Sequence, residues 1–248
     1  MDKKIVIIPT YNEIENVERI VRAVLALPGG YEVLIIDDAS PDGTADAVRA
    51  LQTEFPERLH LLCRSGKLGL GTAYLGGFRW ALERGYDYIF EMDADFSHNP
   101  EDLPRLEAAC AQGADLAVGS RYCDGISVVN WPIGRILISY FASVYVRKIL
   151  GVRLFDSTAG FVCYTRKVLQ TIDLDAICMK GYGFQIEMKY TALKLGFTLK
   201  EVPVIFVNRK EGSSKMSGSI FGEAFWGVIG LRFRKVSAAR SASAPDRR

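Results

Sequence analysis

Two aspartates separated by one residue follow an apolar stretch near the middle of the chain. Asp93 and Asp95 come directly after the run Y-I-F-E-M at 88–92 and stand before F-S-H-N-P at 96–100. If the run is a strand, both carboxylates lie at its carboxyl end, where they could converge on a hard divalent cation, which prefers oxygen ligands. The pattern therefore indicates a site for a divalent cation and a diphosphate or, as the alternative, an Asx turn that begins a helix.

Other polar clusters follow apolar runs in the same way. The cluster D-D-A-S-P-D-G-T occupies 37–44, and P-T-Y-N-E occupies 9–13. Asp38 could accept hydrogen bonds from a base or a ribose. Asp42 and Gly43 could instead serve only the fold, because aspartate caps helices and glycine adopts left-handed turn conformations. Ligands of parallel α/β sheets bind at the carboxyl ends of the strands, so these clusters form the candidate site.

The elements that must position these residues alternate between strands and helices in the first half of the chain. This alternation is typical of parallel βαβ units and predicts an α/β fold with a mostly parallel central sheet. Helices are indicated where apolar residues recur three and four positions apart. The predicted strands are 5–8, 33–36, 59–62, 88–92 and 116–118, and the predicted helices are 13–27, one that begins after 44, and 70–84.

The length and composition of the chain exclude several classes of protein. At 248 residues and 27.5 kDa the chain can bury a core without disulfides, and its five cysteines form no C-x-x-C pair. A net charge of +2 argues against bulk nucleic-acid binding. The chain contains no uninterrupted apolar stretch of about 18 residues, so the sequence predicts no membrane span. The first residues lack the pattern of a signal peptide, so we expect a cytoplasmic protein.

Two segments of the second half combine apolar, aromatic and basic residues. The segment 131–150 could be a buried helix between domains or an interfacial helix that leads a lipid tail toward Arg135. The segment 219–235 has the pattern of an amphipathic helix with basic residues at its end. We therefore expect a catalytic domain over 1–218, a membrane-surface helix over 219–235 and a disordered tail over 236–248, with peripheral contact at the inner face of the membrane.

The full series of motifs resembles the family 2 glycosyltransferases of the GT-A fold, and more narrowly the polyprenol-phosphate (dolichol-phosphate) mannose synthases. The resemblance covers about residues 4–235 and implies a Rossmann-like GT-A domain. The early motifs occur in many family 2 enzymes, whereas their combination with the last two is narrower. The motifs are P-T-Y-N-E at 9–13, D-D-A-S-P-D-G-T at 37–44, G-K-L-G-L-G-T-A at 66–73, D-A-D-F-S-H-N-P at 93–100, G-S-R-Y at 119–122, D-S-T-A-G-F at 156–161, G-Y-G-F-Q-I-E at 181–187 and R-K-E-G-S-S-K at 209–215.

The resemblance implies a reaction and a role for individual residues. The enzyme would move mannose from GDP-mannose to a polyprenyl phosphate, with Mg²⁺ or Mn²⁺. The alternatives are a UDP-glucose or UDP-N-acetylglucosamine donor with a lipid-phosphate or glycan acceptor, and a non-catalytic, membrane-associated protein that binds sugar nucleotides. The implied donor residues are Pro9, Tyr11, Glu13, Asp38, Lys67 and Ala94, with Arg209 and Lys215 over the diphosphate; the cation faces Asp93, Asp95 and Gln185; and the lipid phosphate lies near Arg121, Arg135 and Ser139.

One position departs from the pattern of the family. This chain reads Gly160-Phe161-Val162, where many relatives have arginine after Gly-Phe. Any anion contact made by that arginine must be lost here or supplied by another residue.

The implied transfer does not require a strong general base. A phosphate monoester has a second pKa of about 6, so it is largely a dianion at cytoplasmic pH. The site must instead neutralise charge and hold the acceptor in line, which predicts inversion at the anomeric carbon. His98 lies in the loop after Asp95, and that position favours a structural role over proton transfer.

Overall fold

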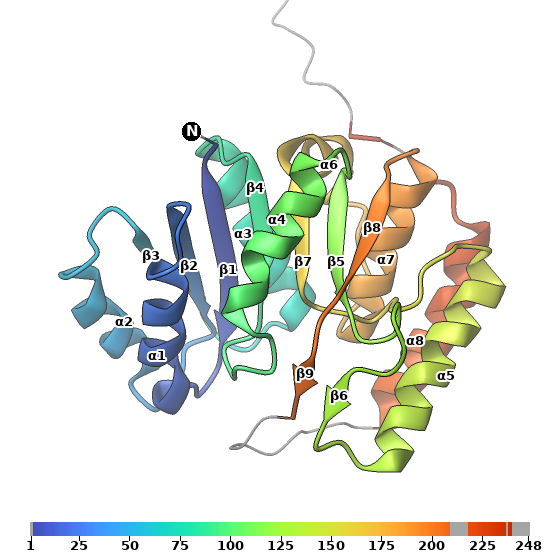
Figure 1. The fold of residues 1–248 in the computed structure, drawn as a ribbon, viewed down its shortest axis with the longest axis horizontal. Coiled ribbons are helices and arrows are strands. Elements are labelled where there is room, and N and C mark those ends of the chain that lie inside the picture. Colours follow the sequence, from blue (N-terminus) through green and yellow to red (C-terminus); the bar gives the residue numbers. More distant parts are fainter. Residues whose placement is uncertain (1, 209–217, 237, 240–248) are drawn as a thin grey trace, which may run out of the picture.

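The protein is built on a twisted, mostly parallel β-sheet (Figure 1). The computed structural model describes residues 2–208, 218–236 and 238–239. The described residues form a seven-stranded sheet in the order β3-β2-β1-β4-β7-β5-β8, and a short arm in which β6 pairs with β9. The strands are β1 (Lys4–Thr10), β2 (Tyr31–Asp37), β3 (Leu59–Cys63), β4 (Tyr88–Glu91), β5 (Leu116–Ser120), β6 (Val128–Val129), β7 (Val162–Thr165), β8 (Leu199–Pro203) and β9 (Phe206–Val207).

The direction of one strand differs from that of its neighbours. β7 pairs antiparallel with both β4 and β5, whereas the other pairs of the sheet are parallel. The predicted α/β fold and its mostly parallel sheet are confirmed. The helices are α1 (Ile14–Leu25), α2 (Thr44–Gln52), α3 (Leu70–Glu83), the 3₁₀ turn η1 (Pro100–Asp102), α4 (Leu103–Ala111), α5 (Ile133–Leu150), α6 (Arg166–Thr171), α7 (Tyr182–Lys194) and α8 (Gly218–Phe233).

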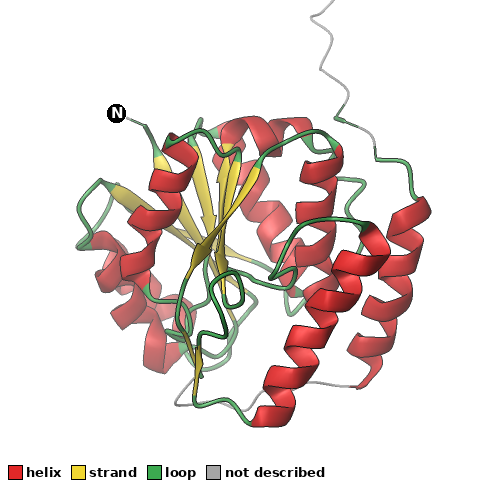
Figure 2. Cartoon of the chain, turned by 45° about the vertical axis from the view of Figure 1, so that its right-hand side comes forward, coloured by secondary structure: helices red, strands yellow, loops and turns green. Residues whose placement is uncertain are grey.

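Helices cover both faces of the sheet and bury it (Figure 2). Side chains of α1, α2 and α4 join one hydrophobic cluster, and those of α3, α6 and α7 join the cluster on the opposite face. Gly77 lets α3 lie directly on the sheet, because a Cβ there would be 2.8 Å from Ile7 Cγ2 and 2.9 Å from Ile36 Cδ1. The start of α3 lies near the carboxyl ends of the strands because the helix follows the parallel strand β3.

α5 and α8 lie side by side beyond the β8 edge of the sheet (Figures 1 and 2). Together with α7 they enclose a third hydrophobic cluster. The helix predicted over 219–235 is therefore packed into the fold through α5 and α7. The predicted tail over 236–248 falls mostly outside the described residues. The cluster consists of Val146, Leu150, Ile186, Tyr190, Val228 and Leu231.

Candidate active site

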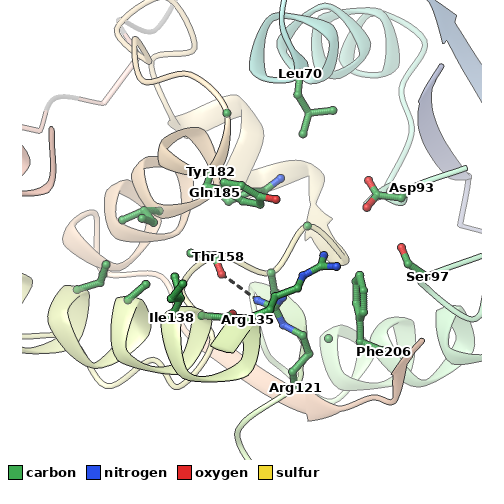
Figure 3. Close-up of a pocket in the computed structure, with 18 of the residues that line it drawn as sticks. Leu70, Asp93, Ser97, Arg121, Arg135, Ile138, Thr158, Tyr182, Gln185 and Phe206 are labelled. Atoms are coloured by element: carbon green, nitrogen blue, oxygen red, sulfur yellow. Dashed lines mark hydrogen bonds between the residues drawn. The ribbon is translucent and has the colours of Figure 1, made fainter. Parts of the chain in front are cut away.

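A cavity of about 640 Å³ opens at the carboxyl edge of the sheet, between the loops of this edge and helices α5, α7 and α8. Figure 3 shows Asp93 and Ser97 on one side of it, and Arg121 and Arg135 on another. The structure thus brings together the residues predicted for the cation and for the lipid phosphate. The predicted site residues that line the cavity are Asp93, Asp95, Gln185, Arg121, Arg135 and Ser139.

The acidic side of the cavity is the loop that follows β4. Asp95 Oδ1 accepts a hydrogen bond of 3.0 Å from the backbone N–H of Ser97. The N–H of Asp93 donates to His98 Nδ1 at 3.1 Å, and the imidazole stacks on Phe161 with ring centroids 4.9 Å apart. Burial lowers the pKa of His98, which favours the neutral ring that can accept this bond. The contacts agree with the structural role predicted for His98.

The oxygen atoms of this loop fit a hard divalent cation. Asp93 and Asp95 supply carboxylates, and the buried Ser97 Oγ has no hydrogen-bond partner within the described part of the chain. Within those residues, no group of three or more His, Cys, Asp or Glu side chains could hold a metal ion. A cation here would therefore keep coordination positions for diphosphate oxygens and water, as Mg²⁺ does in many phosphate sites.

Gln185 lies in the same cavity but has partners of its own. Its amide nitrogen donates to Glu91 Oε2 at 2.5 Å, and its amide oxygen accepts from Lys189 Nζ at 3.0 Å. The oxygen that would bind a cation is thus already hydrogen-bonded to an ammonium group. The role of Gln185 as a metal ligand therefore stays a prediction. Ala94, which was predicted for the donor site, packs its side chain in the hydrophobic core.

The basic side of the cavity contains two arginines in different surroundings. The Arg135 guanidinium stacks on Trp131, 3.9 Å from the ring centroid, and donates to Asn208 Oδ1 at 3.0 Å. Arg121 is buried and forms a bidentate ion pair with Asp156, through Nε at 2.7 Å and Nη2 at 2.6 Å. Burial opposes ionisation of Asp156, but the charge and hydrogen bonds of Arg121 outweigh it and lower the pKa of the carboxyl. The positive charge of Arg121 is therefore partly compensated.

An apolar wall leads away from the two arginines. Ser139 follows Arg135 by one helical turn on α5, and Ile138 and Phe141 continue the lining along that helix. Phe225 adds to the wall from α8, where its ring stacks with that of Tyr145, 4.7 Å between centroids. The predicted acceptor residues are thus next to a surface suited to hydrocarbon.

The residues predicted to hold the nucleotide lie at the same sheet edge, beyond the lining of the cavity. Lys67 Nζ lies over the ring of Tyr11, 4.5 Å from its centroid. Arg64 binds the carboxylate of Asp38 through Nε and Nη2, at 2.5 and 2.6 Å. Pro9 is part of β1, and Glu13 directly precedes α1. The predicted residues Arg209 and Lys215 lie outside the described residues.

Asp42 and Gly43 have a structural role, which was one of the two predicted alternatives. Asp42 accepts hydrogen bonds from the backbone N–H of Thr44 and of Ile14, which joins the starts of α1 and α2. Gly43 has φ +89°, a left-handed conformation that glycine adopts at low cost.

The family of the chain is decided by its match to a family model. The model described as glycosyl transferase family 2 matches residues 5–173, which include the strand-end motifs and the loop of Asp93 and Asp95. The chain belongs to glycosyltransferase family 2.

Two relatives of this family 2 glycosyltransferase match nearly the whole chain. It is 48% identical over 233 residues to the polyprenol monophosphomannose synthase of Mycolicibacterium smegmatis, with 92% of this chain and 88% of the relative covered. It is 50% identical over 237 residues to the undecaprenyl-phosphate mannosyltransferase of Micrococcus luteus, with 92% and 97% covered.

Solved structures of the same fold come from a more distant enzyme, the glucosyl-3-phosphoglycerate synthase of Mycobacterium tuberculosis. Its complex with UDP gives a TM-score of 0.68 at 17% identity and covers 93% of this chain and 80% of that chain. Its complex with Mn²⁺, UDP and glucosyl-3-phosphoglycerate gives 0.64 at 19% identity, with 93% and 78% covered. The GT-A fold implied by the sequence is confirmed. Of the helices that the structure describes, none combines the length and apolar character that crossing a membrane requires.

Several residues of this family 2 site were not singled out from the sequence. Asp156 and Thr158 hold Arg121, Arg64 holds Asp38, and Trp131 supports Arg135. Asp156 and Thr158 belong to the quoted motif D-S-T-A-G-F, which was the available signal for them. Arg64 directly follows β3, so its place at the carboxyl end of a strand was the available signal for it.

Proposed function

We propose that this glycosyltransferase moves mannose from GDP-mannose to a polyprenyl phosphate. The observation that carries the proposal is one cavity with carboxylates on one side, arginines on another and an apolar wall between two helices. Relatives of 48% and 50% identity are named for polyprenol monophosphomannose synthesis and for undecaprenyl-phosphate mannosyl transfer. The combination suits a diphosphate donor, an anionic acceptor head and a hydrocarbon tail.

In the proposed reaction a phosphate oxygen of the acceptor forms a bond to the anomeric carbon. The bond between that carbon and the donor diphosphate breaks, and GDP leaves with the electron pair. Attack occurs on the face opposite the leaving group, so an α-linked donor gives a β-linked lipid product. The acceptor is already a dianion near pH 7 and loses no proton, which is consistent with a buried His98 whose Nδ1 accepts a backbone hydrogen bond.

Asp93 and Asp95 would hold the divalent cation, Mg²⁺ or Mn²⁺, and the hydroxyl of Ser97 could supply a further oxygen. When bound, the cation would neutralise charge on the leaving diphosphate. Arg135 would bind the acceptor phosphate, since its planar guanidinium matches phosphate oxygens. Arg121 would add a weaker positive field, because Asp156 compensates its charge.

A radiolabel assay tests the donor and the acceptor together. Purified protein is incubated with Mg²⁺ or Mn²⁺, a polyprenyl phosphate and either GDP-[¹⁴C]mannose or UDP-[¹⁴C]glucose, and counts in the organic phase are measured. We expect counts with GDP-mannose and a β linkage in the product. Counts with UDP-glucose alone would reject the donor, and an α linkage would reject the inverting displacement.

Arg135→Gln is expected to reduce kcat/KM for the polyprenyl phosphate about 10- to 100-fold, since a hydrogen bond to a charged group contributes about 1.5–3 kcal/mol. Binding of GDP, measured by calorimetry, should change little. Arg79→Gln is the control, because Arg79 is exposed on α3 and does not line the cavity. Equal losses of acceptor use and GDP binding would reject the assignment of Arg135 to the acceptor.

The apolar wall continues onto the surface of α5 and α8, which supports a peripheral position at the inner face of the membrane. Ile133 is 77% exposed and Phe141 60% exposed on α5, and Trp226 is 70% exposed on α8. Arg147 and Lys148 in the last turn of α5 add positive charge. Exposed apolar side chains with neighbouring basic residues favour an interface with anionic lipid.

Phe141→Ser combined with Trp226→Ser is expected to reduce co-sedimentation with vesicles of anionic phospholipid several-fold, because two large apolar side chains no longer enter the interface. Ile14→Ser is the control, since Ile14 is 42% exposed at the start of α1. Unchanged sedimentation of the double variant would show that α5 and α8 do not form the membrane contact.

A further inference from the structure

A lysine is enclosed within the protein beside the candidate active site. Lys189, on α7, is fully buried, and its ammonium group donates to Ala159 O at 2.6 Å and to the backbone and side-chain oxygens of Gln185 at 3.1 and 3.0 Å. A longer contact of 3.4 Å joins it to Ser157 O. A buried ammonium is unfavourable unless an opposite charge and hydrogen bonds replace its hydration. The carbonyl oxygens supply the hydrogen bonds, so the opposite charge must come from elsewhere.

That charge is Glu91, the last residue of β4, and Gln185 bridges the two groups. Gln185 Nε2 donates to Glu91 Oε2 at 2.5 Å while its Oε1 accepts from Lys189. Because an ammonium only donates and a carboxylate only accepts, a single orientation of the amide satisfies both. A continuous series of hydrogen bonds therefore runs from Glu91 through Gln185 to Lys189.

Val162 is the residue directly opposite Glu91 in the antiparallel pairing of β7 with β4. Such residues project to the same face of a sheet, with Cβ atoms about 4.5–5.5 Å apart. In this chain Val162 is fully buried in the hydrophobic core, and the cation comes from α7.

We propose that Lys189 is the counter-ion of Glu91, with Gln185 between the two groups, and that it is a positioning residue for both sides of the active site. The role rests on the proposed function, because it concerns how the donor and acceptor sides are held relative to each other.

On the acidic side, the bridge restrains the end of the strand that carries the cation loop. Glu91 precedes Asp93 by two residues, and Gln185 ties it to α7. Movement of Glu91 would therefore move the backbone from which both loop carboxylates project.

On the basic side, Lys189 fixes the loop that precedes β7. Its ammonium binds the carbonyls of Ser157 and Ala159, and Thr158 between them accepts a hydrogen bond of 2.8 Å from Arg121 Nη2. The ammonium of Lys189 thus contacts the loop that holds Arg121 and, through Gln185, the strand end that precedes Asp93. Loss of the ammonium is expected to disturb both sides together.

Three variants test the pairing, namely Lys189→Met, Glu91→Gln and the two combined. Methionine keeps much of the apolar volume of lysine without the charge. We expect each single variant to lower the urea midpoint and to reduce kcat about 10- to 100-fold, the range for residues that support a site, with smaller changes in KM. The combined variant leaves no unpaired charge, so it should lose no more than either single variant. Lys194→Met, an exposed lysine of the same helix, is the control.

Multiplicative losses in the combined Glu91 and Lys189 variant would overturn the pairing. The urea midpoints need no substrate, so a wild-type protein that transfers no mannose would reject the proposed function and leave the pairing test decisive.

Discussion

Asp95→Asn is expected to reduce kcat for mannosyl transfer about 10²- to 10³-fold, the range for removing one group that stabilises developing charge. The substitution preserves shape, and the amide oxygen can still accept the hydrogen bond from the N–H of Ser97. The loss therefore comes from the missing negative charge and cation ligand. Steady-state kinetics over a series of Mn²⁺ concentrations measures it, and the Mn²⁺ concentration for half-maximal rate should rise.

Asp124→Asn serves as the matched control, because Asp124 is exposed and does not line the cavity. It should retain wild-type rates and the same dependence on Mn²⁺. Circular dichroism and the thermal midpoint establish that the Asp95 variant is folded. A folded variant with near-normal turnover would remove Asp95 from the cation site.

Asp156→Asn is expected to lower the free energy of unfolding by about 3–5 kcal/mol, because it leaves the buried Arg121 guanidinium without its counter-charge. Urea denaturation near pH 7 measures the loss. Adding Arg121→Met to this variant should recover part of it, since the combined change leaves no isolated buried charge. A loss below about 1 kcal/mol, typical of an exposed ion pair, would contradict the structure.

The loss should depend on pH in a definite direction. The folded pKa of Asp156 is below its ordinary value, so the stabilisation by its charge is fully present above the unfolded pKa of about 3.9. It is lost as the pH falls through the lower folded pKa. The difference in unfolding free energy between wild type and Asp156→Asn should therefore be constant from about pH 5 upward and shrink below about pH 4. A difference that grows on acidification would reject the assigned shift.

Much of the acidic side could be predicted because it depends on local rules. A parallel strand followed by polar residues places those residues at the ligand-binding edge, which is where Asp93, Asp95 and Asp38 lie. The helix starts were predicted for a similar reason, since Asp42 and Gly43 act within a few residues of their own position. In both cases sequence neighbours are also neighbours in space.

The supporting residues could not be predicted from such rules. Asp156 and Thr158 precede β7, and because β7 is antiparallel its start, not its end, reaches the ligand-binding edge. A search for polar residues after strands therefore passes over them. Lys189 lies in the middle of the buried helix α7, and its partner Glu91 is 98 positions earlier in the chain. Only the packing of α7 on the sheet joins them.

The hydrophobic cluster between α5, α7 and α8 shares three residues with the cavity. Val146, Ile186 and Val228 belong to the cluster and also line the site. A substitution that reshapes the pocket for a bulkier or slimmer tail would also change how the last helix is anchored. The same side chains therefore affect both the shape of the pocket that would receive an acceptor tail and the packing of α8 against α5 and α7.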